Sequence, residues 1–305
     1  MAETRRETVP AALADERIDR VVAMITDASR ARVRSLIEGE HVRVDGAIVT
    51  KSSQRVREGD EIVVEIDEVV VPLMADATID LTVVYEDDDV IVIDKPAGLV
   101  VHPGAGHRHD TLVSALLARY PDIASTGDSQ RPGIVHRLDK GTSGLMMVAR
   151  SPRAYQSLVA QLSTRSATRS YRALVCASFD EREGVIDAPI GRSSRAPTRM
   201  AVTPKGRGAR TQYVVEQRFV YPFAASLLSC RLESGRTHQI RVHLSAIGAP
   251  VLGDERYGGR RVQVPMPRPW LHAARLGFAH PVTDDPMEFE SPLPADLTDV
   301  LAQFA

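Results

Sequence analysis

The sequence predicts an α+β fold, and three observations support this prediction. Strand-like segments dominate the chain after residue 80, and the few helical segments do not alternate regularly with them, which argues against a doubly wound parallel sheet. The 305 residues are 43% hydrophobic, with 20 Gly and 19 Pro. This ordinary globular composition excludes collagen-like, coiled-coil and wholly disordered chains. The length is sufficient for one large and one small domain, each with its own core.

The sequence pattern of the N-terminal part of the chain predicts a short tail followed by two helices. Residues 1–14 show no clear periodicity, and we expect them to form a loose tail. Apolar residues recur at helical spacing over 18–25. Ser29 is a suitable N-cap for a second helix, which Gly39 would end.

Strands are expected to complete this small module. Residues 41–44 alternate between polar and apolar, and Asp45-Gly46 is a typical hairpin turn. A further strand is expected over 61–66, and a Pro-containing stretch with little periodicity follows it. The predicted organisation is therefore a tail (1–14), a small helix–helix–strand module (15–66), a linker (67–80) and a larger domain (81–305).

In the larger domain, short apolar runs predict strands and 3.6-residue periodicity predicts helices. The expected strands cover 90–93, 145–149, 171–177, 213–218 and 225–233. The expected helices cover 110–120, with Asp110 as the cap, 152–162 and 237–247.

The charge of the chain is small overall but unevenly distributed. The formal net charge is −2, from 38 basic and 40 acidic residues. However, residues 130–172 contain eight Lys or Arg and one acid, and residues 192–215 contain six and none. A nearly neutral protein with two such blocks can present one positive face to RNA or DNA, although an ordinary solvated surface explains the counts equally well.

Cysteine usage and hydropathy predict a cytoplasmic protein. Cys176 and Cys230 lie in apolar runs without metal-ligand spacing, which indicates free thiols in a reducing compartment. The N-terminus has no apolar segment of signal-peptide length. No run of ~18 apolar residues occurs, so no membrane span is expected. Nothing in the sequence indicates a symmetric interface, and we expect a monomer.

The second helix of the small module carries Arg30, Arg32 and Arg34, and Lys51 follows in a loop. Arg30 and Arg34 are four residues apart and therefore share a helix face. A basic helix face can follow the phosphates of a nucleic acid. Residues 1–66 nevertheless contain 11 basic and 13 acidic residues, so on charge alone this face is simply solvated.

The most informative string is GIVHRLDKGTSG, at residues 133–144. It places Asp139 close to Arg137 and Lys140 in a glycine-containing loop before an apolar strand. Cationic neighbours lower the pKa of a carboxyl group and keep it ionised. Such a carboxylate is a candidate nucleophile, metal ligand or partner in a surface ion pair, and from this string alone the ion pair is the commonest outcome.

Two other kinds of chemistry would need further ligands or acids near Asp139: metal binding and catalysis by a pair of carboxylates. The candidate metal ligands are His136, His238 and His243. The last two are five residues apart, a poor match to the i, i+4 spacing of two ligands on one helix face, so no metal is expected. A hydrolase with two catalytic acids would need Glu233 or Asp254 beside Asp139, and nothing in the sequence pairs them.

Together the strings resemble the RluA/RluD-type pseudouridine synthases, which modify large-subunit ribosomal RNA and, in some members, transfer RNA. Residues 29–60 also resemble the S4 RNA-binding module, with Asp45 where that family usually has Asn. In the larger domain, the strings that carry the resemblance are DKPAGLVVHP (94–103), HRLD with TSG (136–144), SYRALV (170–175), GRTHQIRVHL with GDERYG (235–258) and LHA with LGF and HP (271–281).

The resemblance implies a mixed, largely antiparallel sheet core with flanking helices and loops. It also implies an isomerase that breaks the N-glycosidic bond of uridine, turns the base and rejoins it through carbon, without a cofactor or metal. Asp139 would be the essential nucleophile or base. Arg236 is expected to pair with Asp139 and hold it ionised.

The same resemblance implies how the uridine is bound. The base must be flipped out of its stack into a pocket. Arg137 would fill the gap in the RNA, and Tyr171 would stack on the uracil, a contact worth roughly 1–3 kcal/mol, and relay a proton. Ile240 and Lys140 are expected to contact the substrate.

The implied partner is large-subunit ribosomal RNA or its precursor particle. Alternatives are a transfer-RNA synthase, a non-catalytic S4-type RNA-binding protein and a hydrolase of a small substrate. The residues expected to hold RNA outside the pocket are Arg30, Arg32, Arg34 and Lys51 in the small module and Arg192, Arg195 and Arg199 in the second basic block.

Overall fold

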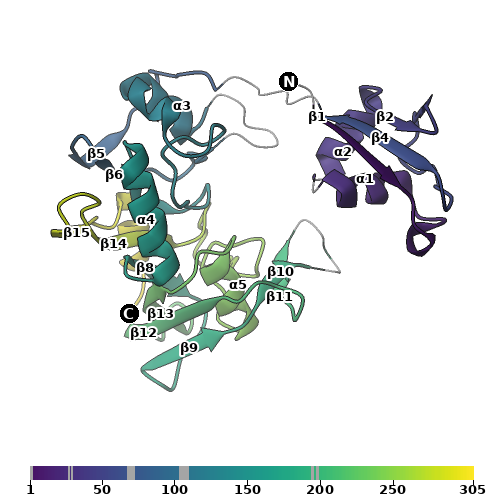
Figure 1. Ribbon diagram of the computed structural model, residues 1–305. Helices are drawn as coiled ribbons and strands as arrows, with labels where there is room; N and C mark the ends of the chain where they lie inside the picture. The colour runs from purple at the N-terminus through teal and green to yellow at the C-terminus, as the bar shows by residue number, and fades with distance from the viewer. Residues whose placement is uncertain are drawn as a thin grey trace. The chain divides into compact units, whose positions relative to one another are not determined.

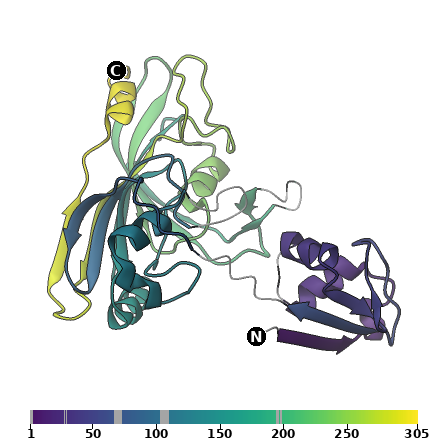
Figure 2. The same ribbon diagram turned by 90° about the horizontal axis from the view of Figure 1, so that it is seen from above.

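The computed structural model describes residues 3–26, 28, 30–66, 73–102, 110–193, 196 and 199–305. The chain forms two compact units, Met1–Pro72 and Leu73–Ala305 (Figures 1 and 2). The division lies within the stretch proposed as a linker, of which residues 67–72 are outside the described residues.

The small unit contains two helices and an antiparallel sheet in the order β1-β4-β2-β3. Its elements are β1 (Glu3–Thr8), the 3-10 helix η1 (Ala11–Leu13), α1 (Ile18–Thr26), α2 (Arg30–Glu38), β2 (Val42–Val44), β3 (Ala47–Ile48) and β4 (Glu61–Ile66). The apolar faces of α1 and α2 are buried together, with Ile18 and Val22 from one helix and Val33 and Leu36 from the other.

The expectation of a loose N-terminal tail is wrong. Residues Glu3–Thr8 form β1, which pairs with β4 along its whole length. The sequence ETRRET has no apolar alternation, so the strand is held by backbone hydrogen bonds to β4, and Val9 is buried just after it. The Ser29 cap proposed for α2 lies outside the described residues.

The larger unit contains the mixed, largely antiparallel sheet that was predicted. Nine strands of its described part form the sheet in the order β5-β6-β7-β14-β8-β13-β12-β9, with β15 paired to β14, and among these pairs only β7 and β14 run parallel. The strands are β5 (Thr82–Glu86), β6 (Val90–Lys95), β7 (Ser143–Ala149), β8 (Thr168–Val175), β9 (Glu183–Asp187), β12 (Arg210–Phe219), β13 (Ala225–Leu232), β14 (Leu271–Ala279) and β15 (Pro286–Glu290).

Helices and a small ribbon surround this sheet (Figure 1). They are α3 (Leu112–Arg119), the 3-10 helix η2 (Pro121–Ser125), α4 (Pro152–Thr164), the ribbon β10 (Ile190–Arg192) with β11 (Met200–Val202), α5 (Gln239–Ala246) and α6 (Ala295–Leu301). The helix expected from Asp110 is capped instead by Thr111, whose buried hydroxyl accepts the backbone N–H of Ser114. Helix α4 starts at Pro152 as predicted, after the Ser151 cap.

Strands β6 and β7 are buried on both faces, which makes them the centre of the larger core. On β6, Ile91 and Ile93 join the cluster that includes residues of α3, α5 and α6, whereas Val90 and Val92 join the cluster beneath α4. Residues of β7 alternate between the two clusters in the same way. The loop that precedes β7 is therefore anchored to the buried centre of the larger unit.

Gly144 fixes the point where this loop enters the sheet. Its φ is +113°, and a Cβ atom built on it would lie 2.3 Å from the carbonyl oxygen of Ala273. Only glycine allows β7 and β14 to approach so closely in this conformation. The parallel pairing of Ser143 with His272 and of Gly144 with Ala273 depends on that approach.

Both cysteines are free thiols; Cys230 is buried and Cys176 is half-buried. None of the described helices combines the length and the apolar character needed to cross a membrane.

Candidate active site

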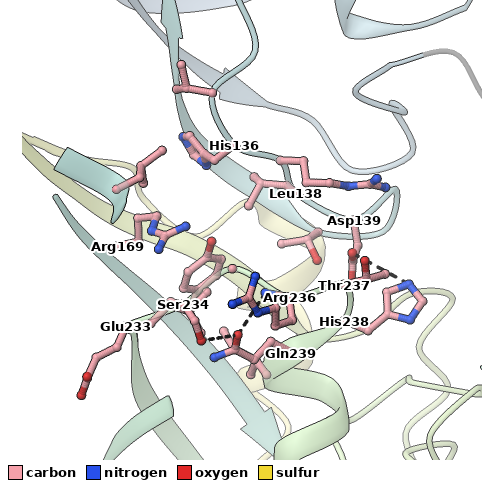
Figure 3. Close-up of a pocket in the computed structure, with 18 of the residues that line it drawn as sticks. His136, Leu138, Asp139, Arg169, Glu233, Ser234, Arg236, Thr237, His238 and Gln239 are labelled. Carbon is pink, nitrogen blue, oxygen red and sulfur yellow. Dashed lines mark hydrogen bonds and ion pairs between the residues drawn. The ribbon is translucent and has the colours of Figure 1, made fainter. Parts of the chain in front are cut away.

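A pocket of about 640 Å³ in the larger unit collects five of the six residues that the sequence singled out for catalysis or substrate contact (Figure 3). It lies where the loop before β7, strand β8 and the beginning of α5 meet. The residues that line it include Asp139, Arg137, Tyr171, Arg236 and Ile240. Residues far apart in the chain therefore converge on one concave surface, as substrate sites commonly require.

Asp139 is half-buried at this surface, and its partner is Arg241. The Nη1 atom of Arg241 donates a hydrogen bond of 2.9 Å to Oδ2 of Asp139. The predicted pairing of Arg236 with Asp139 is wrong, because Nε of Arg236 donates to the carbonyl oxygen of Gly208 at 3.1 Å. Arg236 belongs to the exposed turn before α5, whereas Arg241 lies on the buried face of the helix.

Arg241 is itself held by a second carboxylate. Asp254 is 1% exposed and accepts from Nε at 2.6 Å and from Nη2 at 3.0 Å. Burial lowers the pKa of Arg241, but the hydrogen bonds and charges of Asp254 and Asp139 outweigh burial and raise the pKa above its ordinary value. The guanidinium therefore remains a fixed positive charge between two carboxylates. Asp254, considered above as a second catalytic acid, serves instead to orient Arg241.

Tyr171 and Ile240 form apolar parts of the pocket wall. Tyr171 is 5% exposed and Ile240 is 3% exposed. Burial raises the pKa of the Tyr171 phenol, an effect that the charge of Arg169 opposes and that of Asp139 reinforces. The phenol is therefore protonated at neutral pH. Its ring and the Ile240 side chain offer a surface suited to a flat, uncharged base.

Arg137 and Lys140 lie on either side of Asp139 in the chain but differ in their relation to the pocket. Arg137 is exposed and lines the pocket, with Nη1 3.0 Å from Nε2 of His102. Lys140 is also exposed but is not one of the lining residues.

Comparison with known proteins accounts for both units. A family model described as RNA pseudouridylate synthase matches residues 89–246, and the S4 domain model matches residues 16–62. The first match alone covers more than half of the chain. The chain belongs to the RNA pseudouridine synthase family. It is therefore an isomerase that acts on RNA, and its S4 domain is an RNA-binding module.

Several known proteins are similar to this synthase over nearly its whole length. An uncharacterized RNA pseudouridine synthase of Chloroflexus aurantiacus is 50% identical over 99% of this chain and 94% of its own. The ribosomal large subunit pseudouridine synthase D of Pseudomonas aeruginosa is 43% identical over 96% of this chain and 93% of its own. Among solved structures, human RNA pseudouridylate synthase domain containing 1 aligns with a TM-score of 0.58 at 29% identity, covering 74% of this chain and 88% of that one.

The three histidines considered as metal ligands have separate partners in the synthase. Nε2 of His136 accepts the backbone N–H of Met147, and His243 is buried between Thr211 and Ala188. Nδ1 of His238 lies 2.8 Å from the Tyr257 hydroxyl. Within the described ranges no group of three His, Cys, Asp or Glu side chains is placed to bind a metal ion.

His238 is the histidine closest to the catalytic candidate. Its Nε2 atom is 3.9 Å from Oδ1 of Asp139, the oxygen that Arg241 leaves open (Figure 3). Its backbone is left-handed, with φ of 57°, so α5 starts at Gln239, later than predicted. Burial lowers the pKa of His238, and the charge of Asp139 only partly opposes this. The imidazole is therefore neutral at physiological pH, and Asp139 depends on Arg241 for its counter-charge.

The residues proposed to hold RNA outside the pocket vary in their surroundings. Arg34 is exposed, and its Nε donates to Glu38 at 2.8 Å, which offsets part of its charge. Lys51, Arg192 and Arg199 are exposed and Arg32 is half-buried. The side chain of Arg30 and the whole of Arg195 lie outside the described residues.

Sequence reasoning missed Lys95, which is fully buried at the end of β6. Its Nζ atom donates to the carbonyl oxygens of Pro96 and Leu99 at 2.7 and 2.9 Å. Burial lowers the pKa of Lys95 to about 7, and the negative charge of Asp139 limits that fall. The string DKPAGLVVHP (94–103) thus places a lysine with an unusual pKa close enough to interact electrostatically with Asp139 in the pocket.

We expect Lys95 to make the synthase more stable as the pH rises from 7 toward 10. In the unfolded chain its pKa is near 10.5, so in this range the unfolded state binds the proton that the folded state has lost. The free energy of unfolding then increases with pH. Urea unfolding of wild type and Lys95→Met at pH 7, 8 and 9 measures the effect. Wild type should gain stability relative to the variant, and a constant difference would contradict the prediction.

Proposed function

We propose that this synthase converts specific uridines of large-subunit ribosomal RNA to pseudouridine. The observation that carries the proposal is the similarity to the ribosomal large subunit pseudouridine synthase D of Pseudomonas aeruginosa, which spans both the S4 domain and the catalytic unit. A transfer-RNA substrate would use the same chemistry, but the full-length similarity favours ribosomal RNA. A non-catalytic RNA-binding protein is disfavoured by membership of the enzyme family.

Asp139 is the proposed catalytic residue. The reaction breaks the bond between N1 of uracil and C1′ of ribose and forms a bond between C5 and C1′, while C5 loses a proton and N1 gains one. Asp139 acts as the nucleophile or base that makes this exchange possible. Arg241 places a positive charge beside it and directs its oxygens, since a bidentate contact with Asp254 fixes the guanidinium.

The remaining pocket residues bind the flipped nucleotide. Tyr171 supplies the face on which uracil stacks and a protonated phenol that can relay the proton from C5. Ile240 closes the apolar side of the pocket. Arg137, exposed at the rim, takes the place of the uridine in the RNA stack. The basic residues listed for the S4 domain and the second basic block contact phosphates, so RNA binding weakens as salt increases.

The test is to map pseudouridines in a strain that lacks the protein. The strain is complemented with wild type, with Asp139→Asn or with the exposed control Asp180→Asn. Carbodiimide labelling and primer extension then cover the large-subunit RNA, with transfer RNA in parallel. Sites in large-subunit RNA should return with wild type and Asp180→Asn only. If the restored sites lay only in transfer RNA, the assignment of ribosomal RNA as the substrate would be wrong. If the profiles of both RNAs were the same with and without the protein, the proposed function would be wrong.

A further inference from the structure

Arg169 on β8 is a buried cation with no counter-ion among the residues that the structure describes. The residue is 8% exposed and lines the pocket. Its Nε atom is buried without a hydrogen-bond partner, and among the described residues none makes an ion pair with its guanidinium. Other arginines at the pocket donate hydrogen bonds to protein acceptors. Arg241 donates to two carboxylates, Arg165 donates to Glu233 and Arg236 donates to a carbonyl oxygen.

The acids nearest to this part of the pocket are already engaged. Glu233 accepts from Arg165 at 2.8 Å and from Gln212 at 2.7 Å, and Figure 3 shows its carboxylate directed away from Arg169. Asp139 is bound by Arg241. His136 and Tyr171 lie within reach of the charge of Arg169, and both are neutral. Burial and the charge of Arg169 lower the pKa of His136 to about 3, and burial raises the pKa of the Tyr171 phenol.

The space beside the guanidinium is kept open by a glycine. A Cβ atom built on Gly235 would lie 3.0 Å from Nη1 of Arg169. Gly235 belongs to the turn between β13 and α5, which also lines the pocket. A side chain at this position would press on the guanidinium, so glycine leaves Arg169 accessible from the pocket.

An unpaired charge in such a buried position is costly unless a ligand brings the opposite charge. A uridine nucleotide carries its only negative charge on phosphate, and a guanidinium matches phosphate oxygens in a two-pronged geometry. A uracil carbonyl would accept a hydrogen bond but leave the charge uncompensated. We propose that Arg169 binds the phosphate adjacent to the flipped uridine and so positions its ribose against Asp139.

This inference rests on the proposed function, because it takes the flipped uridine as the occupant of the pocket. The probes are 5′-UMP, 3′-UMP and uridine, and their affinities for the full-length protein are measured by calorimetry. Wild type should bind one UMP isomer about tenfold or more tightly than uridine, as expected for a charge-assisted contact. The isomer that binds more tightly identifies which phosphate Arg169 holds.

The variants separate a phosphate contact from other roles. Arg169→Met should bind UMP and uridine equally, with the affinity for uridine unchanged, and Arg169→Lys should keep part of the preference. The matched control is Arg172→Met, which removes the same charge from the exposed face of the same strand. It should behave as wild type. The melting temperature of Arg169→Met should equal or exceed that of wild type, because an unpaired buried charge is removed.

Several results would overturn the proposal. These are a wild type without preference for UMP, a preference that survives in Arg169→Met, an equal loss of uridine and UMP affinity, or a melting temperature that falls by several degrees. The measurement uses mononucleotides, so its failure is distinct from a failure to find ribosomal sites by pseudouridine mapping.

Discussion

Replacing Asp139 with Asn should reduce pseudouridine formation by at least about three orders of magnitude, the scale seen when an essential catalytic group is removed. The amide has the shape of the carboxylate but can act neither as a nucleophile nor as a base at neutral pH. Single-turnover rates on large-subunit RNA from the deletion strain provide the measurement. Residual activity within tenfold of wild type would contradict the assignment of Asp139.

The structure also predicts what this substitution leaves intact. Arg241 keeps its two hydrogen bonds to Asp254, so no buried charge loses its partner entirely. We therefore expect Asp139→Asn to melt within a few degrees of wild type and to bind the RNA with similar affinity. A large fall in stability would mean that lost activity reflects unfolding. The Asp180→Asn variant controls for a change of carboxylate to amide at an exposed position.

The second large effect is expected at Arg241. Arg241→Met leaves Asp254 buried without its counter-charge and Asp139 without the donor that holds it. Removal of one partner from a buried ion pair costs about 3–5 kcal/mol of stability. Arg236→Met, in the exposed turn before α5, should change stability by only about 0.5 kcal/mol or less. Urea unfolding of both variants measures the difference.

A double variant distinguishes the two roles of Arg241. Adding Asp254→Asn to Arg241→Met removes the unpaired buried carboxylate and should restore much of the lost stability. Activity should stay low, since Asp139 still lacks its partner. If the double variant recovered both properties, Arg241 would serve only the fold. If Arg236→Met were the more damaging single change, the assignment of the ion pair would be wrong.

The elements with strong apolar patterns could be predicted from the sequence alone. The α+β class and the strands that became β6, β7, β8, β12 and β13 were predicted. The side chains of β6, β7, β8 and β13 are largely buried, whereas β12 buries only every fourth residue, Thr211, Val215 and Phe219. Edge strands such as β5 and β15, whose residues alternate between exposed and half-buried, gave no comparable signal. Strand β1 was missed because main-chain pairing with β4, not side-chain burial, holds it in place.

The candidate site was predicted in composition but not in all its contacts. Asp139, Tyr171 and Ile240 converge in one pocket as the resemblance implied. The choice between Arg236 and Arg241 could not be made from spacing, because it depends on where α5 begins and which face it buries. The left-handed residue His238 shifts that start, and no sequence rule indicated it. Arg169 acquires its significance from being buried without a partner, and Asp254 from being buried beside Arg241.

The parallel pairing of β7 with β14 governs the order in which this enzyme can assemble. Strand β7 directly follows the loop that carries Asp139, but β14 begins only at Leu271. Pairing across such a separation in sequence is slow to form, whereas the small unit pairs within Met1–Pro72. During translation the RNA-binding module can therefore fold first. A nascent chain stopped before β14 would be able to hold RNA without a finished catalytic centre.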